Sequence, residues 1–185
     1  MSLDLPPPVL YSFRRCPYAM RARLAIVASG FCVELREIVL REKAPEFLAS
    51  SPKGTVPVLV TPTGVIEESF DVMLWALERS DPQGWLEMPE AGYDWIARCD
   101  GPFKTALDHT KYAVRYPDLD PEQERGRAAE FLADLNLQIA SSDWLFGPKC
   151  TLADMAIVPF VRQFANSDRS WFDAQPWPNL QRWLS

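Results

Sequence analysis

The chain has four cysteines and a single histidine, and this scarcity excludes several kinds of chemistry. The cysteines are too far apart to form a CxxC pair, and no cysteine and histidine cluster has the spacing of a zinc site. A Ser-His-Asp mechanism would have to use His109, and nothing near His109 in the sequence suggests one. The sequence therefore predicts neither a dithiol centre nor a metal centre.

Long apolar runs and basic runs are also missing. No stretch approaches the roughly 20 apolar residues that a membrane helix needs, and Met1–Pro8 lacks the basic start and apolar run of a signal peptide. The net charge is −6 without a cluster of lysine and arginine, which argues against a nucleic-acid partner. We therefore expect a cytoplasmic protein without a membrane or nucleic-acid partner, in which a local site can still hold a small anionic ligand.

What is present is enough apolar material for a core. Hydrophobic residues make up 48% of the 185 residues and charged residues 24%, which argues against disorder. The length suits one large domain or two small ones.

The first half of the chain is predicted to alternate strands with helices. After Pro17, the residues Met20, Leu24, Val27 and Phe31 fall at helical spacing, with Gly30 as a helix stop. The order is β-α-β-α-β-β-α, a thioredoxin-like arrangement that ends in a β-hairpin. The expected strands are Val9–Phe13, Phe31–Leu40, Val56–Val60 and Val65–Glu67, and the expected helices are residues 17–30, Pro45–Ser50 and about Ser69–Arg79. In the second strand, Val33 and Leu35 alternate with polar residues.

The second half is predicted to be all-helical. Asp81-Pro82-Gln83-Gly84 is a composition break of the kind found in linkers. The segments Tyr93–Tyr112, Pro121–Ile139 and Thr151–Phe164 read as helices. We therefore expect a thioredoxin-like domain over residues 1–80, a linker over 81–88 and an all-helical domain over 89–185.

Cys16 is the strongest candidate for chemistry. It lies after a strand and directly before Pro17, at the expected start of a helix. A free thiol has a pKa near ~8.5, and only the thiolate is a good nucleophile. The helix N-terminus and the nearby arginines, Arg14 and Arg15 together with Arg21 or Arg23, favour the thiolate form. Cys32, Cys99 and Cys150 are expected to be packing residues instead.

The second half has one clear local signal, in which Thr151 and Asp154 form a helix capping box with Cys150 and Met155 as a staple. We interpret Asp154 as structural. The aromatics Trp95, Tyr112, Tyr116 and Trp171 are expected to pack in a core, with a substrate pocket as the alternative.

Three short motifs resemble a known family. Arg15-Cys16-Pro17-Tyr18-Ala19, followed by arginine, resembles the active-site start of Omega-class glutathione transferases and of monothiol glutaredoxins. Val56-Pro57-Val58-Leu59 resembles the segment in which these families hold a cis-proline, and Glu68-Ser69 resembles the glutamate–serine pair of the transferases. Their order and spacing agree across the N-terminal half.

The resemblance implies a glutathione S-transferase fold and glutathione as co-substrate. A cis Val56-Pro57 bond would present backbone groups to an extended peptide ligand. Glu68 would take the ammonium group and Ser69 the carboxylate of a γ-glutamyl group. Lys43 falls where the Omega class keeps a lysine for the glycyl carboxylate, and Tyr18 belongs to the Cys16 motif. A homodimer is also implied.

The expected activity is thiol transfer through Cys16, such as deglutathionylation or dehydroascorbate reduction. One alternative is conjugation of glutathione to electrophiles, for which Tyr11 or Ser12 could stand in. Another is a non-catalytic binding or regulatory protein, as in the stringent starvation proteins. The chain stops in what reads as a helix at Trp183-Leu184-Ser185, so a shortened substrate site is also an expectation. The second substrate stays open at this point.

Overall fold

The computed structural model describes residues 7–185, so most of the segment examined for a signal peptide, residues 1–6, lies outside the described residues. The chain divides into two compact units, and the division follows Leu86, within the expected linker. Within that linker the Asp81 carboxylate oxygens accept from the backbone N–H groups of Trp85 (2.9 Å) and Leu86 (2.8 Å), which orders the segment locally. Nowhere in residues 7–185 does a helix combine the length and apolar character needed to span a bilayer.

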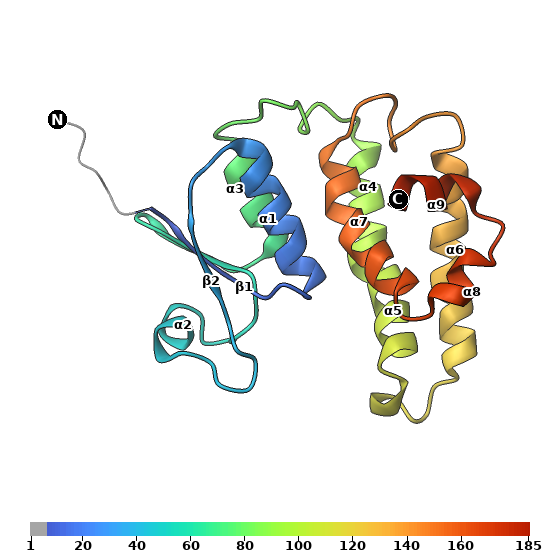
Figure 1. Ribbon diagram of the computed structural model, residues 1–185, viewed down its shortest axis with the longest axis horizontal. Coiled ribbons are helices and arrows are strands. Elements are labelled where there is room, and N and C mark those ends of the chain that lie inside the picture. Colours follow the sequence, from blue (N-terminus) through green and yellow to red (C-terminus); the bar gives the residue numbers. More distant parts are fainter. Residues whose placement is uncertain (1–6) are drawn as a thin grey trace. The chain divides into compact units, whose positions relative to one another are not determined.

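The first unit is a four-stranded sheet with three helices (Figure 1). The strand order is β2-β1-β3-β4, in which β1 runs parallel to β2 and antiparallel to β3, and β3 and β4 form an antiparallel pair. This is the predicted thioredoxin-like arrangement. The elements are β1 (Val9–Ser12), α1 (Pro17–Ser29), β2 (Glu34–Glu37), α2 (Pro45–Ser50), β3 (Val58–Thr61), β4 (Gly64–Ile66) and α3 (Ser69–Leu77).

Alternation along the central strands gives the sheet two apolar faces. Leu10 is opposite Leu59 and Tyr11 is opposite Val58, so the two pairs point to opposite faces. On the face of Tyr11 and Val58, Phe47 of α2 is fully buried and its ring centroid lies 5.1 Å from that of Tyr11. Helices α1 and α3 pack side by side on the other side of the sheet (Figure 1).

Helix α1 begins and ends where the sequence predicts, but it buries a different face. Val27 is 78% exposed and Phe31, just beyond the helix, is 37% exposed, whereas Ala19, Ala22 and Ile26 are buried. The apolar spacing therefore predicted the helix correctly, although the residues at that spacing are not the ones most buried. Small alanine side chains let α1 approach α3 closely, so the larger residues are left on the outer side.

The second strand is also shorter and more exposed than predicted. It covers Glu34–Glu37 rather than Phe31–Leu40, and all four residues are exposed, including Leu35 at 55%. The strand is at the edge of the sheet and pairs only with β1. The alternation of Val33 and Leu35 therefore does not mark a buried face.

The second unit is helical apart from a single bridge between Trp144 and Gly147. The predicted helix over Tyr93–Tyr112 is interrupted by a π-helical stretch that contains Pro102, which has no N–H for an intrahelical bond. The helical elements of the second unit are α4 (Ala91–Arg98), π-helix η1 (Cys99–Phe103), α5 (Lys104–Lys111), the 3-10 turn η2 (Ala113–Arg115), α6 (Pro121–Gln138), α7 (Leu152–Ala165), α8 (Arg169–Asp173) and α9 (Pro178–Leu184).

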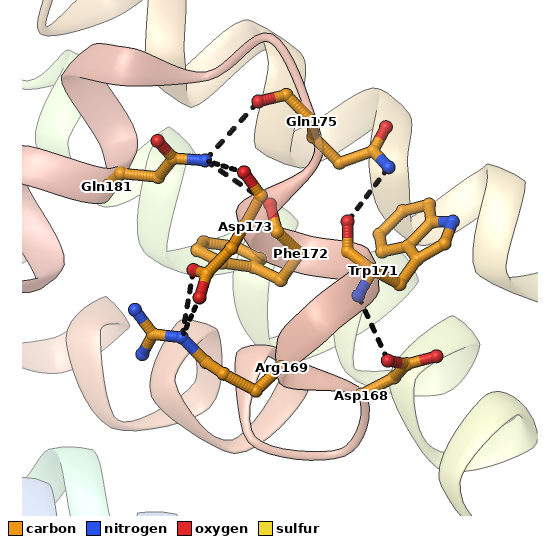
Figure 2. Close-up of polar contacts among 7 residues, drawn as sticks. All are labelled: Asp168, Arg169, Trp171, Phe172, Asp173, Gln175 and Gln181. Atoms are coloured by element: carbon orange, nitrogen blue, oxygen red, sulfur yellow. Dashed lines mark hydrogen bonds and ion pairs between the residues drawn. The ribbon is translucent and has the colours of Figure 1, made fainter.

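Helix α9 ends at Trp183 and Leu184, where the sequence reads as a helix, whereas the short helix α8 was not assigned from the sequence. Asp168 caps α8 by accepting from the Trp171 N–H at 3.0 Å (Figure 2). Gln181 of α9 reaches back to the end of α8, where its Nε2 donates to the carbonyl oxygens of Phe172 (3.3 Å) and Asp173 (3.1 Å) (Figure 2). These side-chain bonds hold two helices that are too short to be stable alone.

The capping box at α7 is confirmed, and Asp154 is structural as predicted. Its carboxylate is fully buried and accepts from the Thr151 N–H (2.9 Å) and hydroxyl (2.8 Å). The same carboxylate accepts from the Leu145 N–H (2.9 Å) and the Trp183 indole N–H (3.0 Å). One buried acceptor therefore joins a loop, the start of α7 and the end of α9.

Two of the four aromatics singled out in the sequence belong to an aromatic cluster in this unit. Trp95 meets Phe131 edge-on at 5.6 Å between ring centroids, and Trp171 meets Phe164 in the same way at 6.0 Å. Tyr116 instead lies against the His109 ring at 4.4 Å. Trp95 and Trp171 therefore pack against buried rings, although both stay half-buried themselves.

Candidate active site around Cys16

Cys16 occupies the N-cap position of α1. Its backbone is extended, with φ −80° and ψ 120°, and the first helical bond runs from the Met20 N–H to the Cys16 carbonyl at 2.9 Å. Pro17 follows in the first turn. The thiol therefore lies at the positive end of the helix dipole, and its side chain is only partly buried.

The Val56-Pro57 bond is cis, which confirms the prediction. Val56 lies two residues before β3, and its carbonyl oxygen is 3.7 Å from Cys16 Sγ, which donates to it. The thiol at the start of α1 and the backbone before β3 are 40 residues apart in sequence and adjacent in space. An extended peptide bound along this backbone would run past the sulfur.

The Glu68-Ser69 pair begins α3. Glu68 is the N-cap residue, and its exposed carboxylate pairs with Lys53 Nζ at 3.1 Å. Ser69 is the first residue of the helix and is 3% exposed, with its Oγ accepting from Arg21 Nε at 2.9 Å. The two residues therefore differ. Glu68 is exposed and pairs with a lysine, while Ser69 is buried and accepts a hydrogen bond from a buried arginine.

Lys43 contacts Gly54, and Tyr18 contacts Arg21. The partly buried Lys43 side chain lies over Gly54, where a Cβ would come within 3.1 Å of Nζ. Gly54 has φ +62°, a left-handed conformation that favours glycine. Tyr18 is also partly buried, and the Arg21 guanidinium lies 5.4 Å from its ring centroid.

The arginines near Cys16 are directed to other partners. The Arg14 N–H and Nε both reach Glu37 Oε1, at 2.8 and 3.4 Å. The Arg15 guanidinium lies 6.0 Å from the Phe13 ring. The two arginines that precede Cys16 in the sequence therefore contact Glu37 and Phe13.

The two hydroxyls that could replace the thiol in a conjugating enzyme are both engaged. Ser12 is fully buried, and its Oγ accepts from Arg23 Nη1. The Tyr11 hydroxyl accepts from Arg36 Nη1 at 3.1 Å. Both residues are buried, whereas the Cys16 thiol is partly exposed.

The other three cysteines lie in different surroundings, and all four are thiols rather than disulfides. Cys99 is buried, as expected for a packing residue. Burial, with the Asp154 charge as a smaller cause, raises the pKa of the Cys150 thiol to about 12. Cys32 is exposed, so the expectation that it packs in a core was wrong.

Sequence reasoning missed the two residues that contact the Glu68-Ser69 pair. Arg21 was not seen as a partner of Ser69, and Lys53 was not seen as a partner of Glu68. Arg21 shares a helix face with the buried Ala25 and Ala28, so a charge inside an alanine stripe was the available signal. Lys53 carried no signal beyond its charge, since it comes close to Glu68 only through the fold.

Two domain models of a known protein family match this chain. Models of the glutathione S-transferase N-terminal domain and C-terminal domain match residues 10–84 and 93–185. The fold defines a class of proteins in which a thioredoxin-like unit is followed by a helical unit. The chain belongs to the glutathione S-transferase family.

Individual relatives are distant. Glutathione S-transferase GstB of Escherichia coli strain K12 is 26% identical over 156 residues, which cover 75% of this chain and 71% of GstB. Elongation factor 1-gamma 3 of Oryza sativa subsp. japonica is 29% identical over 182 residues, which cover 90% of this chain and 42% of that protein. A glutathione transferase family member from Pseudomonas fluorescens, solved with two glutathione bound, has the same fold, with a TM-score of 0.82 at 18% identity over 99% of this chain and 88% of that one.

Proposed function

We propose that this protein is a cysteine-type glutathione transferase, similar to the Omega class, that catalyses glutathione-dependent thiol transfer through Cys16. The observation that carries the proposal is the position of the Cys16 sulfur, which lies at the N-terminus of α1 and 3.7 Å from the Val56 carbonyl. A nucleophile at this place meets a peptide ligand that pairs with the backbone before β3.

Glutathione is the proposed co-substrate. The Val56 backbone would pair with its cysteinyl residue, which brings the two sulfurs together. At the start of α3, Ser69 and the helix N-terminus would hold the γ-glutamyl carboxylate and Glu68 the ammonium group. Lys43 would pair with the glycyl carboxylate, and Tyr18 would line the site beside Cys16.

The reaction proceeds in two balanced exchanges. The Cys16 thiolate attacks the glutathione sulfur of a mixed disulfide, a new S–S bond forms, and the substrate thiolate leaves and takes a proton. A second glutathione thiolate then attacks the same glutathione sulfur, which releases oxidised glutathione and restores the Cys16 thiolate. The residue three positions after Cys16 is Ala19, so release depends on glutathione rather than on a CxxC partner.

Conjugation to electrophiles is the second candidate, because the curated relatives include proteins named glutathione S-transferase. It requires a group that stabilises the thiolate of glutathione itself. Ser12 and Tyr11 are buried, whereas the Cys16 sulfur is partly exposed, and this favours Cys16 over either hydroxyl. The similarity to an elongation factor 1-gamma keeps a non-catalytic role as a further alternative.

The test compares two reactions in the wild type and in Cys16→Ser. With a glutathione–mercaptoethanol mixed disulfide and glutathione, we expect turnover that Cys16→Ser abolishes. With glutathione and a chlorodinitrobenzene, we expect little turnover in the wild type and unchanged or increased turnover in the variant. Wild-type conjugation without disulfide exchange would favour the second candidate, and failure to bind a glutathione column would favour the non-catalytic one.

We also propose a cytoplasmic homodimer. Four cysteines that form no disulfide suit a reducing compartment, since disulfides form mainly in oxidising ones. The dimer is proposed from the family resemblance. Sedimentation velocity at micromolar concentration should give the mass of two chains, and a monomer would contradict this. Recovery of the protein with a cytoplasmic marker on cell fractionation tests the compartment.

A further inference from the structure

A buried arginine lies directly behind the proposed carboxylate site. Arg21 is 3% exposed although it is charged, and its Nε donates to Ser69 Oγ at 2.9 Å. Ser69 is likewise 3% exposed and is the first residue of α3. Arg21 is on α1, so this bond crosses between the two helices that lie side by side in Figure 1.

The chemistry of the pair determines where the serine proton points. A guanidinium has only donors, whereas a serine hydroxyl has one donor and two acceptor lone pairs. Since Arg21 occupies a lone pair of Ser69 Oγ, the hydroxyl hydrogen must point to a different acceptor. A hydroxyl that accepts from a cation is also a better donor, because hydrogen bonds in a chain polarise one another.

Two aromatic rings help to place the guanidinium. The Arg21 Cζ lies 5.4 Å from the ring centroid of Tyr18 and 5.9 Å from that of Phe70, within the range of cation–π attraction. Phe70 directly follows Ser69, so the ring that contacts Arg21 is on the same helical turn as the hydroxyl that Arg21 contacts. The arrangement limits the freedom of a long side chain.

We infer that Arg21 is a positioning residue that orients the Ser69 hydroxyl as a donor to the γ-glutamyl carboxylate of glutathione. The inference rests on the proposed function and adds a residue that does not itself touch the ligand. A purely structural role, a bridge between α1 and α3, would affect every ligand equally. The positioning role affects only a ligand that carries the carboxylate.

The experiment measures dissociation constants by calorimetry in a Cys16→Ser background, which prevents disulfide formation. The two ligands are glutathione and its analogue in which the γ-glutamyl α-carboxylate is a carboxamide. Arg21→Met should weaken glutathione binding about tenfold or more, as expected for loss of a charge-assisted bond, and change analogue binding about twofold or less. Ser69→Ala should show the same pattern. The double variant, which combines Arg21→Met and Ser69→Ala, should lose no more glutathione affinity than the single variants.

Arg79→Met is the matched control, because Arg79 follows α3 and its guanidinium contacts the carbonyl and the ring of Trp75. It should leave both affinities unchanged. Equal losses for both ligands in Arg21→Met, or additive losses in the double variant, would overturn the inference. If circular dichroism shows that Arg21→Met does not fold, Arg21→Lys replaces it. This variant must likewise lose more affinity for glutathione than for the analogue. A parent protein that binds neither ligand would instead overturn the proposed function.

Discussion

The four cysteines show how differently one residue type behaves within a single chain. Cys16 is at the start of a helix, Cys32 is exposed, Cys99 is buried, and Cys150 is partly buried beside a carboxylate. Only Cys16 combines partial exposure with a helix N-terminus and a neighbouring backbone segment that suits a peptide ligand. Reactivity should therefore follow environment rather than accessibility alone.

Thiol alkylation tests this at the level of single residues. In the folded protein at about pH 6, well below the pKa of a free thiol, Cys16 should react faster than the exposed Cys32, because its partly exposed sulfur lies at the N-terminus of α1. Cys99 should stay unmodified because it is buried. Cys150 should stay unmodified because its pKa is raised to about 12, so the protonated form persists up to strongly alkaline pH.

The measurement is iodoacetamide labelling followed by peptide mass spectrometry over a pH series. Labelling in denaturant is the control, and there all four cysteines should react alike. Equal rates for Cys16 and Cys32 at about pH 6 would contradict the assignment of Cys16 as nucleophile.

Sequence reasoning found the residues with local signals and missed those whose partners are distant. Cys16 before Pro17 and the pair Glu68-Ser69 could be recognised because each motif is contiguous. The bond from Arg21 to Ser69 spans 48 positions and depends on how two helices pack. No local pattern encodes such a distance, so the arginine was noticed only as a charge near Cys16.

At the level of elements, Asp154 is expected to be the most sensitive polar residue of the helical unit. Asp154→Ala removes one acceptor and leaves buried donors of Thr151, Leu145 and Trp183 without it. Hydrogen bonds to charged groups contribute about 1.5–3 kcal/mol each, so the loss of unfolding free energy should be about 3 kcal/mol or more.

Urea denaturation followed by circular dichroism measures this loss. Asp173→Ala is the control, because Asp173 forms an exposed pair with Arg169 one turn away. It should change stability by less than about 0.5 kcal/mol. A loss for Asp154→Ala no larger than that of the control would show that the buried network does not stabilise the unit.

Helix α9 depends on a side chain from a distant helix. The Asn136 Oδ1 on α6 accepts from the backbone N–H groups of Asn179 (3.0 Å) and Leu180 (3.1 Å), which satisfies the first turn of α9. Asn136→Ala should therefore lower the unfolding free energy by about 1–2 kcal/mol, the usual cost of a lost cap.

The exposed Asn166, at the end of α7, provides the comparison. Thermal unfolding of both variants, followed by circular dichroism, measures the difference, and Asn166→Ala should be nearly neutral. Equal melting temperatures for the two variants would mean that α9 does not need the cap from α6.

The same examples explain which elements could be predicted. Helix α7 carries its own capping box, and α1 has proline at its start and glycine at its end, so both were found. Helix α9 takes its cap from α6, and β2 is an exposed edge strand, so neither has a complete local signal. The π-helical break at Cys99–Phe103 was signalled by Pro102, which helical spacing alone overlooks.

For the whole molecule, the order of strands and helices was enough to predict an α/β unit followed by a helical unit. The family models match both. A ligand that binds only the folded state should stabilise this molecule by an amount that rises with the logarithm of its concentration relative to its dissociation constant. Glutathione at about 100 times its dissociation constant should add about 2.7 kcal/mol and raise the melting temperature.

Thermal unfolding of the Cys16→Ser variant with and without glutathione measures this shift without covalent chemistry. The control ligand is free glycine at the same concentration, which should have no effect. An unchanged melting temperature with saturating glutathione would remove the basis for the proposed co-substrate.

The central claim is that Cys16 carries glutathione during thiol transfer. The most direct measurement is a single turnover with a glutathione–mercaptoethanol mixed disulfide, quenched with acid and analysed by intact-protein and peptide mass spectrometry. We predict one glutathionyl group per chain, located on the Cys16 peptide and removed when free glutathione is added, with Cys32→Ser behaving like the wild type. A protein that turns over the mixed disulfide without modification of Cys16, or with full activity in Cys16→Ser, would contradict the claim.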